Sequence, residues 1–209
     1  PSRSGQVLSR AVSLSVAILG LIVMSPLLAL IAIAVKLDSA GPVLFVHQRI
    51  GRHGRRFHLL KFRTMHEARG LRSEWERDNR DRVTRVGRIL RAFRLDELPQ
   101  FINVVRGEMN LVGPRPHPAS NYDLFTLVAR NLNQVTGTAV DYYSLRTMVR
   151  PGITGWAQVR YRYANDLDEE IEKLRYDLYY VKHFSVVMDL RILAATVLVM
   201  LKGHPGGRP

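Results

Sequence analysis

The feature that most constrains this chain is an apolar run near its N-terminus. From Ala11 to Val35 there is no charged residue. As an α-helix the run would be roughly 37 Å long at about 1.5 Å per residue, and a bilayer core takes about 20 such residues. A secretory signal has a shorter apolar core, and a soluble buried helix of this length and purity is uncommon. The run therefore predicts a membrane helix.

Ser25-Pro26 stands in the middle of this run. Proline removes a main-chain hydrogen bond and clashes with the carbonyl four residues earlier, so the helix is expected to kink or break there, and the Ser25 hydroxyl can take up part of the freed hydrogen bonding. An ordinary kinked spanning helix and a re-entrant hairpin both fit. Basic residues stay on the cytoplasmic side, and they flank both ends of the run (Arg3, Arg10 and Lys36), which favours the hairpin.

Composition limits the classes of function. The chain has 209 residues, enough for one sizeable domain, and its net charge is +13. Such a surface attracts anions, which can be nucleic acid, anionic lipid or phosphorylated substrates, or it serves solubility alone. The chain has no cysteine, which excludes disulfides, thiolate metal sites and a cysteine nucleophile.

The region after Gly41 predicts a β-hairpin. A short apolar strand over 43–46 is followed by an arginine-rich turn with Gly51 and Gly54, and a second strand follows over 57–62. A helix of mixed charge is expected over 67–82, where acidic residues alternate with arginines in the manner of a solvated face.

Asp96-Glu97 is the most informative acidic pair, because it lies among arginines. Pro99 is tolerated in a first helical turn, and aspartate is a preferred N-cap residue. We therefore expect a helix from Asp96 to Gly107, whose N-terminus would offer N–H groups to an anion. On spacing alone, the two acids can be helix caps or groups of an active site.

Arg115 lies between Pro114 and Pro116, which fix the main chain on both sides of it. The guanidinium fork of arginine matches phosphate oxygens in a bidentate way. A rigidly held arginine is therefore a candidate phosphate clamp.

Two further helices are expected in the last third of the chain. Apolar residues at helical spacing predict one over 168–181, and a second apolar segment predicts one over 190–200. The second is too short to span a bilayer, so it packs in the core or lies in the interface plane. The stretch 119–149 carries no motif, and the tail 204–209 is expected to be disordered.

Five segments stand in an order that resembles a known family. They are KFRTM (61–65), LDELPQ (95–100), LVGPRP (111–116), RPGITGWAQV (150–159) and YDLYYV (176–181). Together they are similar to the bacterial sugar transferases, the monotopic polyprenyl-phosphate phosphoglycosyl transferases. The resemblance extends from Ser25-Pro26 to about Leu201, and the tail is more similar to members that initiate exopolysaccharide synthesis.

The resemblance implies an α+β fold with a re-entrant membrane helix broken at Ser25-Pro26, a small β-hairpin or sheet, and a helical catalytic body with interfacial helices. Residues 1–40 would form the membrane segment and residues 41–209 the catalytic domain, together one folded unit. The implied location is the cytoplasmic face of the bacterial inner membrane.

The resemblance also implies a reaction. The enzyme would move a sugar-1-phosphate from a UDP-sugar to undecaprenyl phosphate and so initiate exopolysaccharide or other glycoconjugate synthesis. Asp96 and Glu97 would carry the chemistry with Mg²⁺ as cofactor, and Asp96 would form a covalent phospho-sugar intermediate.

The residue types fit this chemistry without the family. Both substrates are anionic, so cations must neutralise the reacting phosphates, and a carboxylate nucleophile handles one anionic substrate at a time. Mg²⁺ is commonly held by one or two carboxylates plus substrate phosphates, which suits Asp96 and Glu97. Each candidate can instead form an ordinary surface salt bridge. The candidate phosphate-binding residues are Lys61, Arg63, Arg91 and Arg115.

Two other functions stay open on the sequence. A basic membrane-anchored nucleic-acid-binding protein would explain the net charge, but an acidic pair among the arginines repels a phosphate backbone. A non-catalytic membrane scaffold would need none of the motif residues. We expect a UDP-sugar, a polyprenyl phosphate and membrane lipid as partners, and no nucleic acid. No short motif encodes the sugar, and self-association stays open.

Overall fold

The computed structural model describes residues 3–66, 81–120, 122, 143–161 and 167–202. The helix expected over 67–82, apart from its end, lies outside this part of the chain, as do most of the stretch 119–149 and the tail 204–209. With η for a short 3-10 helix, the described elements are α1 (Arg3–Asp38), β1 (Leu44–Ile50), η1 (Arg52–Gly54), β2 (Arg56–Phe62), α2 (Arg85–Ala92), η3 (Leu95–Glu97), α3 (Gln100–Val105), β3 (Asn110–Val112), η4 (Tyr143–Met148), β4 (Gly152–Thr154), α5 (Trp156–Arg160), α6 (Leu167–Lys182) and α7 (Val186–Lys202).

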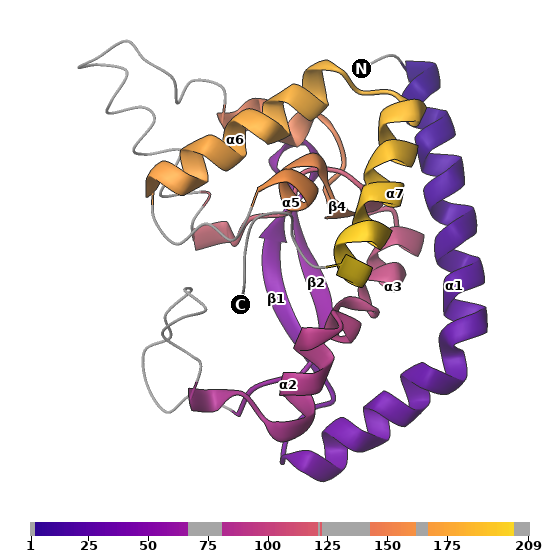
Figure 1. The fold of residues 1–209 in the computed structure, drawn as a ribbon, viewed down its shortest axis with the longest axis vertical. Coiled ribbons are helices and arrows are strands. Elements are labelled where there is room, and N and C mark those ends of the chain that lie inside the picture. Colours follow the sequence, from indigo (N-terminus) through magenta and orange to yellow (C-terminus); the bar gives the residue numbers. More distant parts are fainter. Residues whose placement is uncertain (1–2, 67–80, 121, 123–142, 162–166, 203–209) are drawn as a thin grey trace.

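The apolar run forms α1, a helix that continues through Pro26. Figure 1 shows it bent along one side of the molecule, past α7 and α3 and then toward α2. Pro26 cannot donate to the carbonyl of Ile22, and the Ser25 hydroxyl donates to that carbonyl instead, at 2.8 Å. The helix is therefore bent and not broken, and the expected break at Ser25-Pro26 is not confirmed.

Most of α1 is apolar and exposed. Within the described part of the chain, it is the one helix long and apolar enough to cross a membrane, and only 11% of its most hydrophobic window is buried. Its buried positions form a narrow stripe, with Ser9, Ser13 and Ala17 in the first half and Ile31 and Val35 in the second. Such a helix keeps a wide apolar face for lipid.

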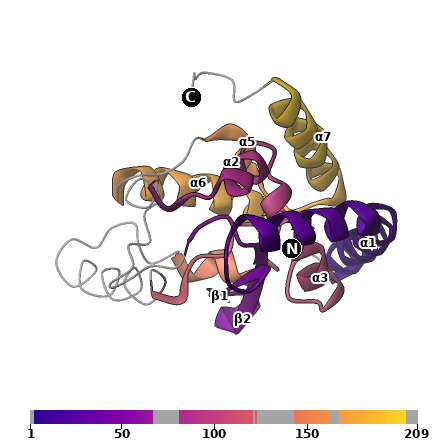
Figure 2. The ribbon, with the colours of Figure 1, turned by 90° about the horizontal axis from the view of Figure 1, so that it is seen from below.

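Polar contacts fix the first half of α1 to the body. The Ser9 hydroxyl donates to Asp189 of α7 at 2.6 Å, and the Tyr180 hydroxyl donates to the other oxygen of the same carboxylate at 2.7 Å. The main-chain N–H of Leu111 in β3 donates to the Ser13 hydroxyl at 3.2 Å. In Figure 2, α1 lies between α7, which leads away from it on one side, and α3 on the other side.

The predicted hairpin is confirmed. β1 and β2 pair antiparallel, with Leu44 opposite Phe62 and Ile50 opposite Arg56, so the first strand is longer than its apolar start indicated. Phe57 and Leu59 of β2 point into a core cluster that also contains residues of α1 and α3. The hairpin thereby fixes the strand from which Lys61 projects.

A second, parallel pair of strands lies beside it in the core. β3 pairs with β4 so that Asn110 lies opposite Gly152 and Val112 opposite Thr154. A Cβ atom on Gly113 would overlap the carbonyl oxygen of Arg150, so the two chains approach at a distance that only glycine allows. This close approach sets the direction of the Pro-Arg-Pro segment that follows Gly113.

Both C-terminal helices are confirmed, as α6 and α7. α7 has two faces, since Met188 and Ile192 are buried in the core, whereas Val197 and Leu198 are exposed. Over the described residues, the fold is helix-rich with two small sheets, in agreement with the α+β class.

Candidate active site

The helix expected to begin at Asp96 begins later. Asp96 and Glu97 lie in η3, and α3 starts at Gln100 with Pro99 in its cap position. Pro99 has no N–H to donate, so it fits this first-turn position without losing a hydrogen bond. The expectation that a long helix begins at Asp96 is therefore wrong. Gly107 has a left-handed φ of 84° and follows the end of α3, as the sequence indicated.

The acid pair lies between two cations from other elements. Lys61 Nζ at the end of β2 is 2.8 Å from Glu97 Oε1 and 3.8 Å from Asp96 Oδ2. Arg115 Nη2 is 2.7 Å from the same Glu97 oxygen. Asp96 and Glu97 are each only 8% exposed. Residues far apart in sequence thus form one compact group of charges.

The two carboxyl groups differ in their electrostatics. Burial alone would raise the pKa of Glu97, but the charges and hydrogen bonds of Arg115 and Lys61 outweigh it and hold that pKa well below its ordinary value. Burial raises the pKa of Asp96, and the charge of Lys61 offsets this only in part. The Glu97 carboxyl is therefore firmly ionised. For Asp96, the neighbouring charges offset less of the effect of burial on its pKa.

The other two phosphate candidates lie in different surroundings. Arg91 Nε donates to the Thr64 hydroxyl at 3.2 Å, and its charge acts to lower the pKa of Asp96. Arg63 is buried, and its guanidinium donates to the carbonyls of Pro42 and Ser39, the latter at 2.6 Å. Arg63 therefore ties down the chain just after α1, and its expected role in phosphate binding stays a prediction.

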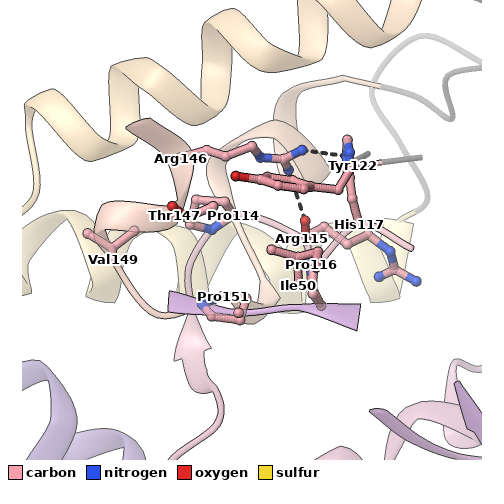
Figure 3. Close-up of a pocket in the computed structure, with 11 residues that line it drawn as sticks. Ile50, Pro114, Arg115, Pro116, His117, Tyr122, Arg146, Thr147, Val149 and Pro151 are labelled. Carbon is pink, nitrogen blue, oxygen red and sulfur yellow. Dashed lines mark hydrogen bonds between the residues drawn. The ribbon is translucent and has the colours of Figure 1, made fainter. Parts of the chain in front are cut away.

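A buried network behind Arg115 was not found from the sequence. Arg146 Nη2 donates to the Asp177 carboxylate at 2.6 Å and to the carbonyl of Arg115 at 2.9 Å. Arg146 Nη1 lies 2.6 Å from Nε2 of His117, whose Nδ1 in turn contacts the Tyr143 hydroxyl. The dashed lines in Figure 3 show Arg146 reaching the Pro-Arg-Pro segment. This network holds the main chain that carries Arg115.

The protonation of His117 follows from its surroundings. Burial lowers the pKa of His117 well below its ordinary value, and the charge of Arg146 lowers it further. A neutral imidazole can accept from Arg146 through Nε2 and donate to Tyr143 through Nδ1. The only sequence signal for this network was Asp177, an acid on the apolar side of a predicted helix within the YDLYYV segment.

Asn103 of α3 is a second buried residue that the sequence did not indicate. Its side chain accepts from the N–H of Leu60 at 3.0 Å and donates to the carbonyl of His58 at 2.7 Å. Both partners lie on β2, so Asn103 fixes α3 to the strand that carries Lys61. The acid pair and its nearest cation are thereby held in register.

Asp96 and Glu97 can bind a divalent cation only if a substrate supplies further ligands. Within the described residues there is no group of three or more His, Cys, Asp or Glu that could hold a metal ion. Asp96 and Glu97 are adjacent carboxylates, and Mg²⁺ is typically bound by one or two carboxylates plus substrate phosphates. The residues present therefore fit Mg²⁺ that arrives with a phosphorylated substrate.

The described residues thus combine an exposed apolar helix with a buried acid pair flanked by cations, an arrangement that can bind phosphate groups beside a membrane surface. The family model described as bacterial sugar transferase matches residues 4–203. The chain belongs to this bacterial sugar transferase family, which is membrane-associated.

Similar proteins support this assignment. The chain is 38% identical to a UDP-N-acetylgalactosamine-undecaprenyl-phosphate N-acetylgalactosaminephosphotransferase of Aeromonas hydrophila, over 97% of this chain and 46% of that protein. It is 41% identical to a UDP-glucose:undecaprenyl-phosphate glucose-1-phosphate transferase of Escherichia coli K12, over 92% of this chain and 40% of that protein. It therefore spans less than half the length of these two relatives. It is also 38% identical to the exopolysaccharide production protein PSS of Rhizobium leguminosarum bv. phaseoli, over 96% of this chain and 98% of that protein.

Proposed function

We propose that this chain transfers a sugar-1-phosphate from a UDP-sugar to undecaprenyl phosphate. The observation that carries the proposal is the buried Asp96-Glu97 pair, with Lys61 and Arg115 within 2.8 Å of Glu97. The names of the relatives describe this reaction for glucose and for N-acetylgalactosamine. We further propose that the product initiates an exopolysaccharide or a related glycoconjugate.

In the proposed first step, the Asp96 carboxylate attacks the phosphorus that carries the sugar. The bond from this phosphorus to the bridging oxygen breaks, and UMP leaves with the electron pair. In the second step, an oxygen of undecaprenyl phosphate attacks the same phosphorus and releases the Asp96 carboxylate. Neither step requires the protein to deprotonate a neutral nucleophile, because both attacking oxygens are anionic.

The neighbouring residues have distinct roles in this scheme. Lys61 and Arg115 neutralise the negative charge that gathers at the reacting phosphate, and Glu97 holds both cations in place. Mg²⁺, held by Glu97 and Asp96, would supply further charge neutralisation when bound. The network of Arg146 fixes the main chain of Arg115, so that its guanidinium needs little reorganisation during the reaction.

The direct test of the activity is a screen of UDP-sugars with undecaprenyl phosphate and Mg²⁺, in which release of UMP is measured. We expect UMP release with at least one UDP-sugar, and only background release when Mg²⁺ is removed by a chelator. A protein that binds random DNA in a salt-dependent way and turns over no UDP-sugar would favour the nucleic-acid alternative.

Arg115 provides a second prediction. Arg115→Lys keeps the positive charge but removes the two-pronged geometry of the guanidinium. We expect kcat/KM to fall more than about tenfold, equivalent to about 1.4 kcal/mol of transition-state stabilisation. Arg175→Lys on α6 is the control, since Arg175 is an exposed residue paired with Glu172. A lysine variant with wild-type kcat/KM would show that a point charge suffices at this position.

The membrane topology gives a third prediction. We propose that α1 is re-entrant, with both ends at the cytoplasmic face of the inner membrane, because its bend at Pro26 lies within an exposed apolar helix that has basic flanks. The chain has no native cysteine, so Ser4→Cys and Ala40→Cys each introduce a single thiol. Both positions are exposed, and Ala40 avoids the contact of Ser39 with Arg63.

An impermeant thiol reagent applied to intact cells is expected to label neither cysteine variant, whereas both should be labelled after the cells are opened. Labelling of Ser4→Cys alone in intact cells would instead establish a helix that spans the membrane. Pro26→Ala should shift the pattern toward spanning, because it restores the hydrogen bond to Ile22 and straightens the helix.

A further inference from the structure

A pocket of about 130 Å³ opens beside the acid pair. The roles proposed above for the charged residues do not account for this pocket. Arg94, Glu97 and Leu98 form one part of its lining, and residues of α3, β4, α5 and α7 supply the rest. Its walls are mostly apolar, with Leu98, Phe101, Val159, Val199 and Met200 among the lining residues. The pocket is therefore amphiphilic, with charged groups only next to the reactive carboxylates.

The apolar part of the pocket is continuous with an exposed apolar surface. Met200 lines the pocket and is itself 59% exposed, and Val197 and Leu198 on the same helix are also exposed. Figure 1 shows α7 beside α5 on one side and beside the membrane helix α1 on the other. An apolar molecule could thus pass from the surface of α7 to the acid pair without crossing a polar barrier.

We propose that this pocket holds the first isoprene unit of the polyprenyl phosphate acceptor, so that the phosphate lies at the acid pair and the remaining chain leaves along α7. This proposal rests on the proposed function. The volume is suitable, because an apolar cavity of roughly 150 Å³ accommodates a six-carbon ring and an isoprene unit has five carbons. An amphiphilic acceptor matches both ends of the pocket, since its phosphate meets Lys61 and Arg115 and its hydrocarbon meets the apolar wall.

The sugar of the donor is a less suitable occupant. A hexose needs a hydrogen-bond partner for each buried hydroxyl. The hydroxyls of Thr154 and Thr196 bond to each other at 2.7 Å, and Gln158 Nε2 donates to the carbonyl of Ile153 at 2.9 Å. Away from Arg94 and Glu97, the buried Oε1 of Gln158 is a lining side-chain acceptor without a partner, and one acceptor is fewer than the hydroxyls of a sugar require.

The test compares two substitutions of the same residue type on the same helix. Val199→Trp fills the pocket, whereas Val187→Trp adds the same bulk at an exposed position near the start of α7, away from the pocket and the proposed lipid path. Met200→Trp is a second filling variant at an exposed position, where the fold tolerates bulk. For each purified variant in detergent micelles, the measurements are KM for undecaprenyl phosphate, KM for the UDP-sugar, and lipid-free exchange of labelled UMP into the UDP-sugar.

We expect the filling variants to raise KM for undecaprenyl phosphate at least tenfold, while KM for the UDP-sugar and the lipid-free exchange stay within about twofold of the Val187→Trp values. If KM for the UDP-sugar rises instead, the pocket holds the sugar and the proposal is wrong. It is equally wrong if the filling variants match Val187→Trp in all three measurements. The proposed covalent route is tested separately, by measuring lipid-free exchange in the wild-type protein.

Discussion

Asp96→Asn is expected to abolish the exchange of labelled UMP into a UDP-sugar in the absence of lipid. A covalent route makes the first half-reaction independent of the acceptor, so the wild-type protein with Mg²⁺ and a UDP-sugar should catalyse this exchange. Asparagine keeps the size of the side chain but has no anionic oxygen to attack phosphorus. We expect the exchange rate to fall at least roughly 10³-fold, as for the loss of other catalytic nucleophiles.

The control for this variant is Glu172→Gln, which makes the same carboxylate-to-amide change on an exposed part of α6. Its exchange rate should equal that of the wild type, and thermal unfolding should show that Asp96→Asn is folded. A wild-type protein that turns over with lipid but shows no lipid-free exchange would contradict the covalent route. Asp96 would then be a metal ligand or a general base in a direct transfer.

The sequence was most informative where a local rule decided the structure. The β1–β2 hairpin follows from apolar strands with a glycine-containing turn, and α6 follows from helical spacing of apolar residues. The proline in α1 predicted a disturbance correctly. The expected use of the Ser25 hydroxyl is confirmed, since it donates to the carbonyl of Ile22, but the helix continues through Pro26 where the resemblance implied a break.

Contacts between distant segments could not be predicted from the sequence. Arg63 stands in a basic motif like the other phosphate candidates, but its guanidinium is used by the main chain after α1. The start of α3 was placed too early because capping preferences do not reveal that η3 turns the acid pair toward β2. Arg146 lies in a stretch without motifs, and only the packing of η4 on α6 brings it to Asp177.

The Arg146–Asp177 pair should therefore be the charged contact whose loss costs the most stability. Both side chains are almost fully buried, at 5% and 3% exposed, and the nitrogen and oxygen atoms are 2.6 Å apart. Asp177→Ala leaves a buried guanidinium without its anion, and removal of one partner from such a pair typically costs about 3–5 kcal/mol. We expect a decrease of this size in the free energy of unfolding, measured by denaturant titration in detergent.

Glu172→Ala is the matched control, because Glu172 lies on the same helix in an exposed ion pair with Arg175. Exposed pairs of this kind contribute about 0.3–0.5 kcal/mol, so this variant should unfold almost as the wild type does. Asp177→Ala should also lower kcat/KM under conditions where it is folded, because Arg146 donates to the carbonyl of Arg115. If both variants lose the same small stability, water solvates Arg146 and the pair does not hold the Pro-Arg-Pro segment. If stability falls but kcat/KM of the folded variant is unchanged, the network supports the fold and does not position Arg115 for catalysis.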